Sequence, residues 1–387
     1  MVSPDGTSVY VTAQKYGRAG PGVDAITELA RDADGALHPL GCLANGGARG
    51  CRASRLPLEG VRHLAIGPDG RDLYALANVG LLEFSIGAGG RLRPVGCIAL
   101  APGSGHSGKR CRRLAAGVPL GPNGIVLSPD GADLYVTGAM KEKGFPRPAW
   151  VGGIYELARR PDGTVDPTPL GCFGPTDARG CATIKTYDLI DPVVSPDGSA
   201  LYAVGYQGIW RFPRAANGSL GAPSCVLGSS DGCEPSYLGY TSLAISPDGS
   251  LLYVGTIGET SAYSIGPTGT LTQVAASPVP SERLALSPDG TRLYGAVYGA
   301  VHDGIRTFAV GGDSLSPLGG LLPIPNVEGM AVTPDGGTLL ATSSCGCRGA
   351  LLAYDSATIA LPVTRQTSLS PAANRPSGIE IVRAASR

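Results

Sequence analysis

The sequence is poor in charge. Only 16% of its 387 residues are charged, and acidic and basic residues cancel at 31 each. The pI is about 6.9. A chain without a basic excess has no field that attracts a phosphate backbone or an anionic membrane surface. We therefore expect no nucleic acid among its partners.

Long apolar runs are also missing. No stretch of the sequence approaches the roughly 18 apolar residues of a membrane span, so we expect none. Residues 1–6 lack the basic, apolar and small-residue succession of a signal peptide. Because the sequence begins inside one of the repeats described below, we expect upstream residues in the native chain.

Familiar catalytic motifs are scarce. The sequence has four histidines and no His-Glu-x-x-His motif. Residues 103–108 satisfy Gly-x-Gly-x-x-Gly, but they lie between Cys97 and Cys111. A nucleotide site needs a strand before this motif and a helix after it. We interpret the segment as a disulfide loop.

Glycine and proline, in contrast, are abundant, at 59 and 33 residues. This is roughly twice their average usage, which is too much for a helical protein. The hydrophobic fraction of 43% is still ample for a core. Together these features predict an all-β fold with many short strands joined by tight turns.

The ten cysteines fall into close pairs. An even number of local pairs predicts disulfides and an oxidising compartment, rather than zinc binding, for the first four pairs. These are Cys42 with Cys51, Cys97 with Cys111, Cys172 with Cys181, and Cys225 with Cys233. Cys345 and Cys347 are separated by one residue, so they form a strained bridge, two thiols or another site.

A repeat organises the whole chain. In seven Pro-Asp-Gly tripeptides the residue five positions after Asp is Tyr, or Leu in the last copy. The Asp residues are Asp5, Asp69, Asp130, Asp197, Asp248, Asp289 and Asp335. Proline presets φ, Asp bonds its local backbone and Gly takes a positive φ, so each tripeptide predicts a turn between two strands. We interpret the Asp side chains as turn formers and the Tyr side chains as packing between blades, with each hydroxyl bonding a neighbouring backbone group.

Successive Asp residues are 64, 61, 67, 51, 41 and 46 positions apart. These distances suit four short strands and a variable insertion, which predicts a seven-bladed β-propeller formed by one domain, residues 1–387. In the second blade we expect strands near 61–67, 72–78, 80–86 and 91–98. We also expect residues 376–382 to provide the innermost strand of the N-terminal blade and so to close the ring.

The Ser-Pro-Asp-Gly-x-x-Leu-Tyr-Val pattern resembles the lactonase-type seven-bladed propellers, which include 6-phosphogluconolactonase-like and YVTN-repeat proteins. The resemblance covers essentially the whole chain. The Gly-Cys loops are similar to those of secreted actinobacterial members. This resemblance implies a lactonase-like hydrolase acting on a small lactone at the mouth of the central channel.

Residues that enter the first strand of each blade differ between blades, and this predicts a site. Val61-Arg62-His63-Leu64 resembles the Pro-Arg-His entry of the family, and Ser281-Glu282-Arg283-Leu284 is a looser match. We assign His63 or Glu282 as general base, and Arg283, Arg62 and Arg375 as carboxylate or oxyanion partners. Other expected ligand-binding residues are Asn123, Asp188 and Tyr240. The alternative is that all these side chains merely line a water-filled channel.

Two further features bear on the site. We expect no cofactor, but Glu282, Asn123 and Asp188 are the one evident set for a divalent cation. The long connection 140–150 ends at Trp150, which is either a ligand wall or a surface residue packed on the neighbouring blade.

The functional alternatives belong to different classes. Besides a lactonase, the sequence fits a noncatalytic extracellular binding or scaffold propeller, or a lyase or isomerase acting on a carboxylated ring. We expect a secreted monomer whose partner is a small lactone or carboxylated ligand.

Overall fold

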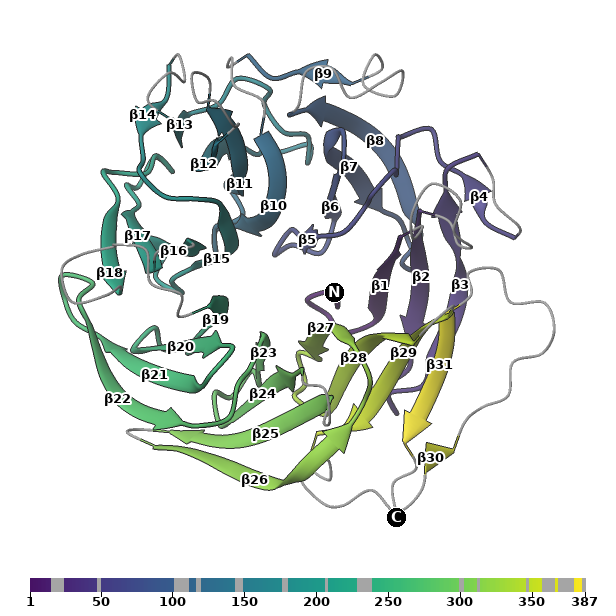
Figure 1. Ribbon diagram of the computed structural model, residues 1–387. Helices are drawn as coiled ribbons and strands as arrows, with labels where there is room; N and C mark the ends of the chain where they lie inside the picture. Colours follow the sequence, from purple (N-terminus) through teal and green to yellow (C-terminus); the bar gives the residue numbers. More distant parts are fainter. Residues whose placement is uncertain are drawn as a thin grey trace. The chain divides into compact units, whose positions relative to one another are not determined.

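The protein is built from β-strands alone in the part of the chain that the structure describes. The structure is a computed structural model that describes residues 1–14, 24–46, 50–100, 111–115, 120–142, 149–175, 180–205, 208–227, 239–298, 303–311, 314–345, 348–356, 366–367 and 379–384. Within these ranges no helix is long and apolar enough to cross a membrane. The strands form seven sheets (Figure 1). The fold is the seven-bladed β-propeller that the repeats predicted.

The chain divides into two compact units. Unit 1 contains Met1–Tyr10, Leu29–Leu40 and Leu238–Arg387, and unit 2 contains Val11–Glu28 and Gly41–Tyr237. The first sheet contributes residues to both units. Its strands are β1 (Ser8–Ala13), β2 (Ala25–Arg31), β3 (Leu37–Ala44) and β4 (Arg52–Ala53).

Unit 2 holds three complete sheets. The first is β5 (Leu64–Ile66), β6 (Asp72–Ala77), β7 (Gly80–Ile86), β8 (Leu92–Ala99) and β9 (Arg112–Arg113). The second is β10 (Leu120–Leu127), β11 (Asp133–Glu142), β12 (Ala149–Ala158), β13 (Gly171–Gly174) and β14 (Ala182–Thr183). The third is β15 (Leu189–Val194), β16 (Ala200–Gly205), β17 (Gly208–Pro213) and β18 (Ser224–Leu227).

Unit 1 also holds three complete sheets. The first is β19 (Tyr240–Ile245), β20 (Leu251–Thr256), β21 (Thr260–Ile265) and β22 (Leu271–Ser277). The second is β23 (Arg283–Leu286), β24 (Arg292–Val297), β25 (Gly304–Gly311) and β26 (Ser314–Pro323). The third is β27 (Val327–Val332), β28 (Thr338–Cys345), β29 (Arg348–Asp355), β31 (Ile379–Ala384) and β30 (Gln366–Thr367).

The four strands of the second blade lie where the sequence predicted them, within three residues at each end. Three short strands were not predicted: β4, β9 and β14 run parallel to the outer strands β3, β8 and β13. Each follows a cysteine loop, which turns the chain back along the outer strand. The prediction of a long connection over residues 140–150 was also partly wrong. Met140–Glu142 belongs to β11 and pairs with β12, with Lys141 opposite Trp150.

The Pro-Asp-Gly turns have the predicted geometry. All seven Asp carboxylates accept a hydrogen bond from the backbone N–H two residues later, as Asp130 does from Ala132 at 3.0 Å. The glycine that follows has a positive φ in every copy, for example 69° at Gly131. These contacts confirm that the repeated Asp residues are turn formers.

The repeated Tyr residues are buried and pack between successive sheets. Tyr74 lies in a cluster with Leu134 and Val136 of the next sheet. Its hydroxyl donates to the Gly163 carbonyl at 2.6 Å, and Tyr135 donates to the Gly218 carbonyl at 2.7 Å. The predicted role is therefore confirmed for these two residues.

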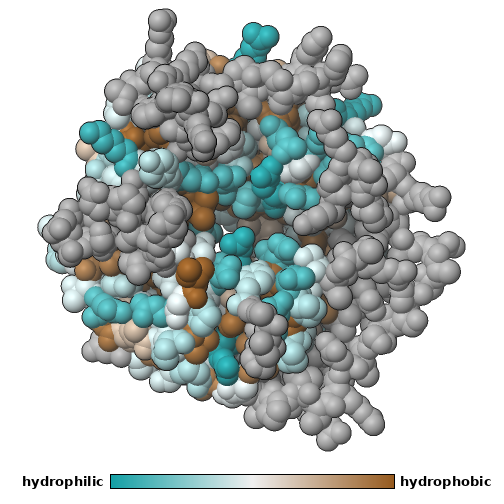
Figure 2. Space-filling model, viewed as in Figure 1, coloured by the Kyte–Doolittle hydropathy of each residue, from teal (hydrophilic) through white to brown (hydrophobic). Residues whose placement is uncertain are grey.

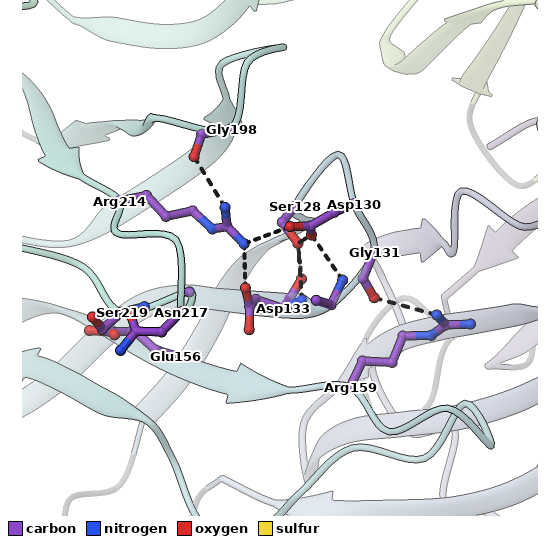
Figure 3. A network of polar contacts seen from close by, with 12 residues as sticks. Ser128, Asp130, Gly131, Asp133, Glu156, Arg159, Gly198, Arg214, Asn217 and Ser219 are labelled. Atoms are coloured by element: carbon purple, nitrogen blue, oxygen red, sulfur yellow. Dashed lines mark hydrogen bonds and ion pairs between the residues drawn. The ribbon is translucent and has the colours of Figure 1, made fainter.

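Ion pairs of nearly buried arginine side chains also join the sheets. Arg214, which follows β17, contacts both Asp130 and Asp133 of the preceding sheet (Figure 3). Its Nε donates to the Tyr135 hydroxyl at 2.6 Å. Arg159, which follows β12, makes the equivalent contacts with Asp69 and Asp72. In unit 1, Arg31 at the end of β2 contacts Asp335 at 2.8 Å. Each of these arginines links its own sheet to the Pro-Asp-Gly turn of another.

The predicted position of the C-terminal strand was wrong. β31 pairs in parallel with β29 of the last sheet, with Leu351 opposite Ile381, and not with the first sheet. In the last sheet β29 would otherwise present an open edge, which β31 covers. In the first sheet Val2 already bridges Val9, and the Met1 amino group donates to the Tyr10 carbonyl at 3.0 Å.

Candidate functional site

In four sheets the first strand carries a β-bulge near its start. A bulge changes the direction in which the side chains there point. In each case one or two residues have no partner across the strand pair. These residues are Asn123 in β10, Asp191 and Pro192 in β15, Thr241 in β19, and Glu328 in β27. They differ in chemistry although their positions repeat. Bulges of this kind are common beside functional sites.

In unit 2 the structure brings together Asn123 and Asp188. The Asn123 Nδ2 donates to both carboxylate oxygens of Asp188, at 3.2 and 3.0 Å, and the Leu189 N–H donates to Oδ1 at 2.9 Å. Burial raises the pKa of Asp188 above its ordinary value.

The backbone around Asp188 is in the left-handed region. Asp188 has a φ of 43° and Asp191 a φ of 48°. Residues other than glycine adopt such angles at a cost of about 1–3 kcal/mol, and they cluster at functional sites. Asp188 is thus a partly buried carboxylate on a strained backbone, fixed by an amide.

Arg62 and His63 lie at the entry to β5. The Arg62 side chain turns back on its own sheet, because Nη2 donates to Asn78 Oδ1 at 2.6 Å and Nε donates to the Gly60 carbonyl at 3.2 Å. His63 is half-buried, and its carbonyl accepts from Leu76 N–H at 2.9 Å. Arg62 is therefore engaged by an amide, and its predicted role in ligand binding stays a prediction.

In unit 1, Glu282 and Arg283 stand at the start of β23. The Glu282 N–H donates to the Ala296 carbonyl at 2.8 Å, which fixes the backbone at this point. The Arg283 side chain is exposed, and its Nη1 donates to the Glu282 carbonyl at 3.1 Å. Glu282 is half-buried, so its carboxylate is only partly shielded from solvent.

Tyr298, which follows β24, joins these two residues into a larger cluster. Burial raises the pKa of the Tyr298 phenol to about 12. The positive charge of Arg283 opposes this rise in pKa, and the negative charges of Glu328, Glu282 and Asp303 add to it. The charges of four side chains of unit 1 therefore act on the Tyr298 phenol. We call Glu282, Arg283, Tyr298, Asp303 and Glu328 the tyrosine cluster.

The sequence predictions missed two members of this cluster. Tyr298 and Asp303 lie in the connection between β24 and β25, whereas the predictions considered only entries to first strands. The signal was present, because these residues interrupt the repeat as the entry residues do. Glu328 is an entry residue, and it accepts from Ser344 Oγ at 2.7 Å.

For three predicted ligand-binding residues the structure gives at most a place in a strand. Tyr240 is the first residue of β19 and pairs with Thr256. Trp150 lies in β12 rather than in a loop. Arg375 lies outside the described residues. Their roles stay predictions.

The three residues predicted to bind a divalent cation belong to different units. Asn123 and Asp188 meet in unit 2, whereas Glu282 belongs to unit 1. Within the described ranges, no group of three or more His, Cys, Asp or Glu side chains could hold a metal ion. A cation site at these residues stays a prediction.

Three of the predicted disulfides are present. They join Cys42 to Cys51, Cys97 to Cys111, and Cys172 to Cys181. Cys225 is disulfide-bonded as well, and Cys233 lies outside the described residues. Cys345 ends β28, and Cys347 also lies outside the described part. The bonded loops hold the ends of the outer strands in place.

Comparison with known proteins gives structural likenesses only. No family model matches the chain, and no curated protein matches it in sequence. Among solved structures, a candidate 6-phosphogluconolactonase of Bacteroides uniformis has a TM-score of 0.60 and 20% identity, over 87% of this chain and 89% of that one. A second candidate 6-phosphogluconolactonase, from Bacteroides fragilis, has a TM-score of 0.60 and 16% identity, over 87% and 88%.

The third likeness is to a periplasmic gluconolactonase of Pseudomonas aeruginosa. It has a TM-score of 0.59 and 19% identity, over 86% of this chain and 88% of that one. At this level of identity the likeness concerns architecture and not activity. The chain shares the seven-bladed β-propeller fold of proteins named as 6-phosphogluconolactonases and gluconolactonases.

Proposed function

We propose that the protein is a lactonase-like hydrolase that opens a small lactone ring. The observation that carries the proposal is the tyrosine cluster, in which the charges of Glu282 and Arg283 both act on the Tyr298 phenol and Arg283 Nη1 contacts the Glu282 carbonyl at 3.1 Å. Ester hydrolysis uses these three kinds of group. The shared fold with proteins named as gluconolactonases also supports it.

The chemistry assigns one role to each group. The general base, Glu282, takes a proton from water, and the resulting hydroxide attacks the lactone carbonyl carbon. Arg283 stabilises the negative charge that develops on the carbonyl oxygen. The ring C–O bond then breaks, and the alkoxide takes a proton to give a hydroxy acid. Because its pKa is about 12, Tyr298 keeps its proton at neutral pH and serves as the donor to the alkoxide.

A noncatalytic binding propeller is the second candidate, favoured by one observation. Arg62 is paired with Asn78, and Asn123 with Asp188, so these side chains are already engaged. Tyr187, next to Asp188, is 48% exposed. Engaged polar groups beside an exposed aromatic ring suit ligand recognition better than proton transfer.

On the face seen in Figure 2, the coloured hydrophobic residues form small groups that hydrophilic residues separate. Extended apolar patches usually mark protein interfaces, and the coloured part of this face has none. We propose a small molecule as the ligand for either candidate function. The disulfides, and the likeness to a periplasmic protein, support a location outside the cytoplasm.

Acid release from a panel of sugar, aliphatic and carboxylated lactones tests the proposal, with and without a chelator. We expect turnover that falls about 100- to 1,000-fold in Glu282→Gln and in Arg283→Ala, as for the loss of a general base or an oxyanion donor. Arg306→Ala is the matched control, because this arginine of the same sheet contacts only the Gly319 carbonyl among the described residues. Equal turnover in all variants would contradict the assignment.

Substitution tests the two predicted bases separately, because His63 belongs to unit 2 and Glu282 to unit 1. Glu282→Gln should abolish turnover if Glu282 is the base, and His63→Ala should abolish it if His63 is the base. A lyase or isomerase would instead consume its carboxylated substrate without net acid release.

A further inference from the structure

Three glutamates occupy equivalent places on equivalent strands of successive sheets. Glu28 in β2, Glu83 in β7 and Glu156 in β12 are each at most 2% exposed. Each lies beside the glycine that begins a cysteine loop, and a Cβ placed on Gly96 would stand 2.6 Å from Glu83 Oε2. The corresponding Cβ on Gly171 would stand 2.9 Å from Glu156 Oε1. The Gly-Cys motif thus leaves room for a buried carboxylate.

An arginine neutralises the first two carboxylates. It is the residue after the second cysteine of the loop. Arg52 Nη2 contacts Glu28 Oε1 at 2.6 Å, and Arg112 Nη2 contacts Glu83 Oε1 at 2.5 Å. The same arginines donate to a carbonyl of the next sheet, since Arg112 Nη1 reaches Val165 at 2.9 Å.

The third copy has no such arginine, because Ala182 stands after Cys181. The third copy keeps the backbone contact that the second copy makes to its glutamate. Leu220 N–H donates to Glu156 Oε2 at 2.9 Å, as Val165 N–H does to Glu83 at 2.9 Å. Among the described residues, no cation pairs with Glu156. Burial raises the pKa of Glu156 to about 7, and the charge of Asp133 adds to this rise.

We propose that the gap beside Glu156 is a binding site for an external alkylguanidinium cation, which takes the place that Arg52 and Arg112 fill in the sister sheets. Ala182 is exposed, and the arginine side chains at the equivalent positions are 43% and 36% exposed, so this position lies at the surface. The site belongs to unit 2 and uses none of the residues of the proposed hydrolytic reaction.

The geometry selects a guanidinium over a metal ion or an ammonium. Arg112 bonds Glu83 through Nη2 and the Val165 carbonyl through Nη1, whereas Arg52 reaches Glu28 and the Leu92 carbonyl through Nη2 alone. A planar group with several donors fits both arrangements, and an ammonium, which is a compact charge, does not reproduce the two-nitrogen contact of Arg112. A metal ion needs more ligands than this one carboxylate provides.

The probe is N-ethylguanidinium, which supplies the atoms that distinguish arginine from Ala182. Calorimetric titration at pH 8, where Glu156 is ionised, should show saturable binding to the wild type. We expect affinity to fall at least tenfold in Glu156→Gln, which keeps the shape and removes the charge. It should also fall in Ala182→Arg, which fills the gap. N-ethylammonium should bind at least tenfold more weakly than N-ethylguanidinium.

Two further titrations identify the source of the cation. A Gly-Arg-Gly peptide binds only if an arginine side chain of another chain can enter, and free guanidino compounds are the ligand if N-ethylguanidinium alone binds. The absence of binding to the wild type, or equal binding to Glu156→Gln, would overturn the proposal. Arg179 of the same cysteine loop lies outside the described residues. Binding that appears only in Arg179→Ala would also overturn the proposal, since the chain would then fill its own gap. If Ala182→Arg fails to fold, Glu156→Gln still decides.

Discussion

Arg159 places its Nη2 2.5 Å from the carboxylate of Asp72, which belongs to the preceding sheet of unit 2. Both side chains are nearly buried, at 10% and 9% exposed. The same nitrogen also contacts Asp69, and Nε donates to the Tyr74 hydroxyl at 2.9 Å. One guanidinium therefore ties together the turn, the strand and the packing tyrosine of the neighbouring blade.

Removal of this guanidinium should destabilise the protein strongly. We expect Arg159→Ala to lower the free energy of unfolding by about 3–5 kcal/mol, because Asp72 would be left buried and unpaired. Arg160→Ala is the control. Its partner Asp166 is partly exposed, so the loss should stay below about 1 kcal/mol. Urea unfolding measures both, and an equal effect of the two variants would contradict a structural role for Arg159.

The raised pKa of Glu156 should make the stability of the protein depend on pH. Its pKa is about 7 in the folded protein and roughly 4.3 in the unfolded chain, so between these values only the folded state holds the proton. The free energy of unfolding should therefore fall as pH rises through this window and level off above it. Glu156→Gln removes this dependence, and urea titrations at pH 5 and pH 8 measure it. A Gln variant with the same pH slope as the wild type would contradict the assignment.

Replacement of Asp188 should raise the stability of the protein and lower its function. Asp188→Asn keeps a side chain that tolerates positive φ and removes a partly buried charge, so we expect stability at pH 7 to rise by about 1 kcal/mol. If Asp188 takes part in ligand binding, affinity or turnover should fall in the same variant. Unfolding and activity measured together test this, and a variant with reduced stability would show that the charge is structural.

Loss of one disulfide should lower the free energy of unfolding moderately. Cys172 and Cys181 close a loop with a sequence separation of 9. We expect the double Cys172→Ala, Cys181→Ala variant to lose about 2–3 kcal/mol by the chain-entropy argument. Urea unfolding of the variant and of the wild type, both without reductant, checks this. An unchanged midpoint would show that the loop does not depend on its bridge.

The sequence predicted the fold well because its repeats are local. Asp130 bonds the N–H two residues away, and Gly131 has the positive φ that the turn requires, so neither depends on distant residues. The partner of the C-terminal strand was predicted wrongly for the opposite reason. Pairing between β29 and β31 depends on which edge is open, and a repeat pattern does not specify this.

The candidate site was harder to predict. Glu282 and Arg283 were found because they break the repeat at a strand entry, but Tyr298 and Asp303 lie in a connection whose length varies among blades. The pairing of Arg112 with Glu83 was missed because the two are separated by 29 residues and meet only when the cysteine loop folds back. Such contacts follow from tertiary structure and not from spacing.

The most direct measurement of the central claim is acid release from lactones by purified wild-type protein and by Glu282→Gln, Arg283→Ala and the control Arg306→Ala. Lactonase-like hydrolysis at the tyrosine cluster predicts turnover in the wild type and the control and its loss in the first two variants. Folded wild-type protein that releases no acid from any sugar, aliphatic or carboxylated lactone would contradict the claim.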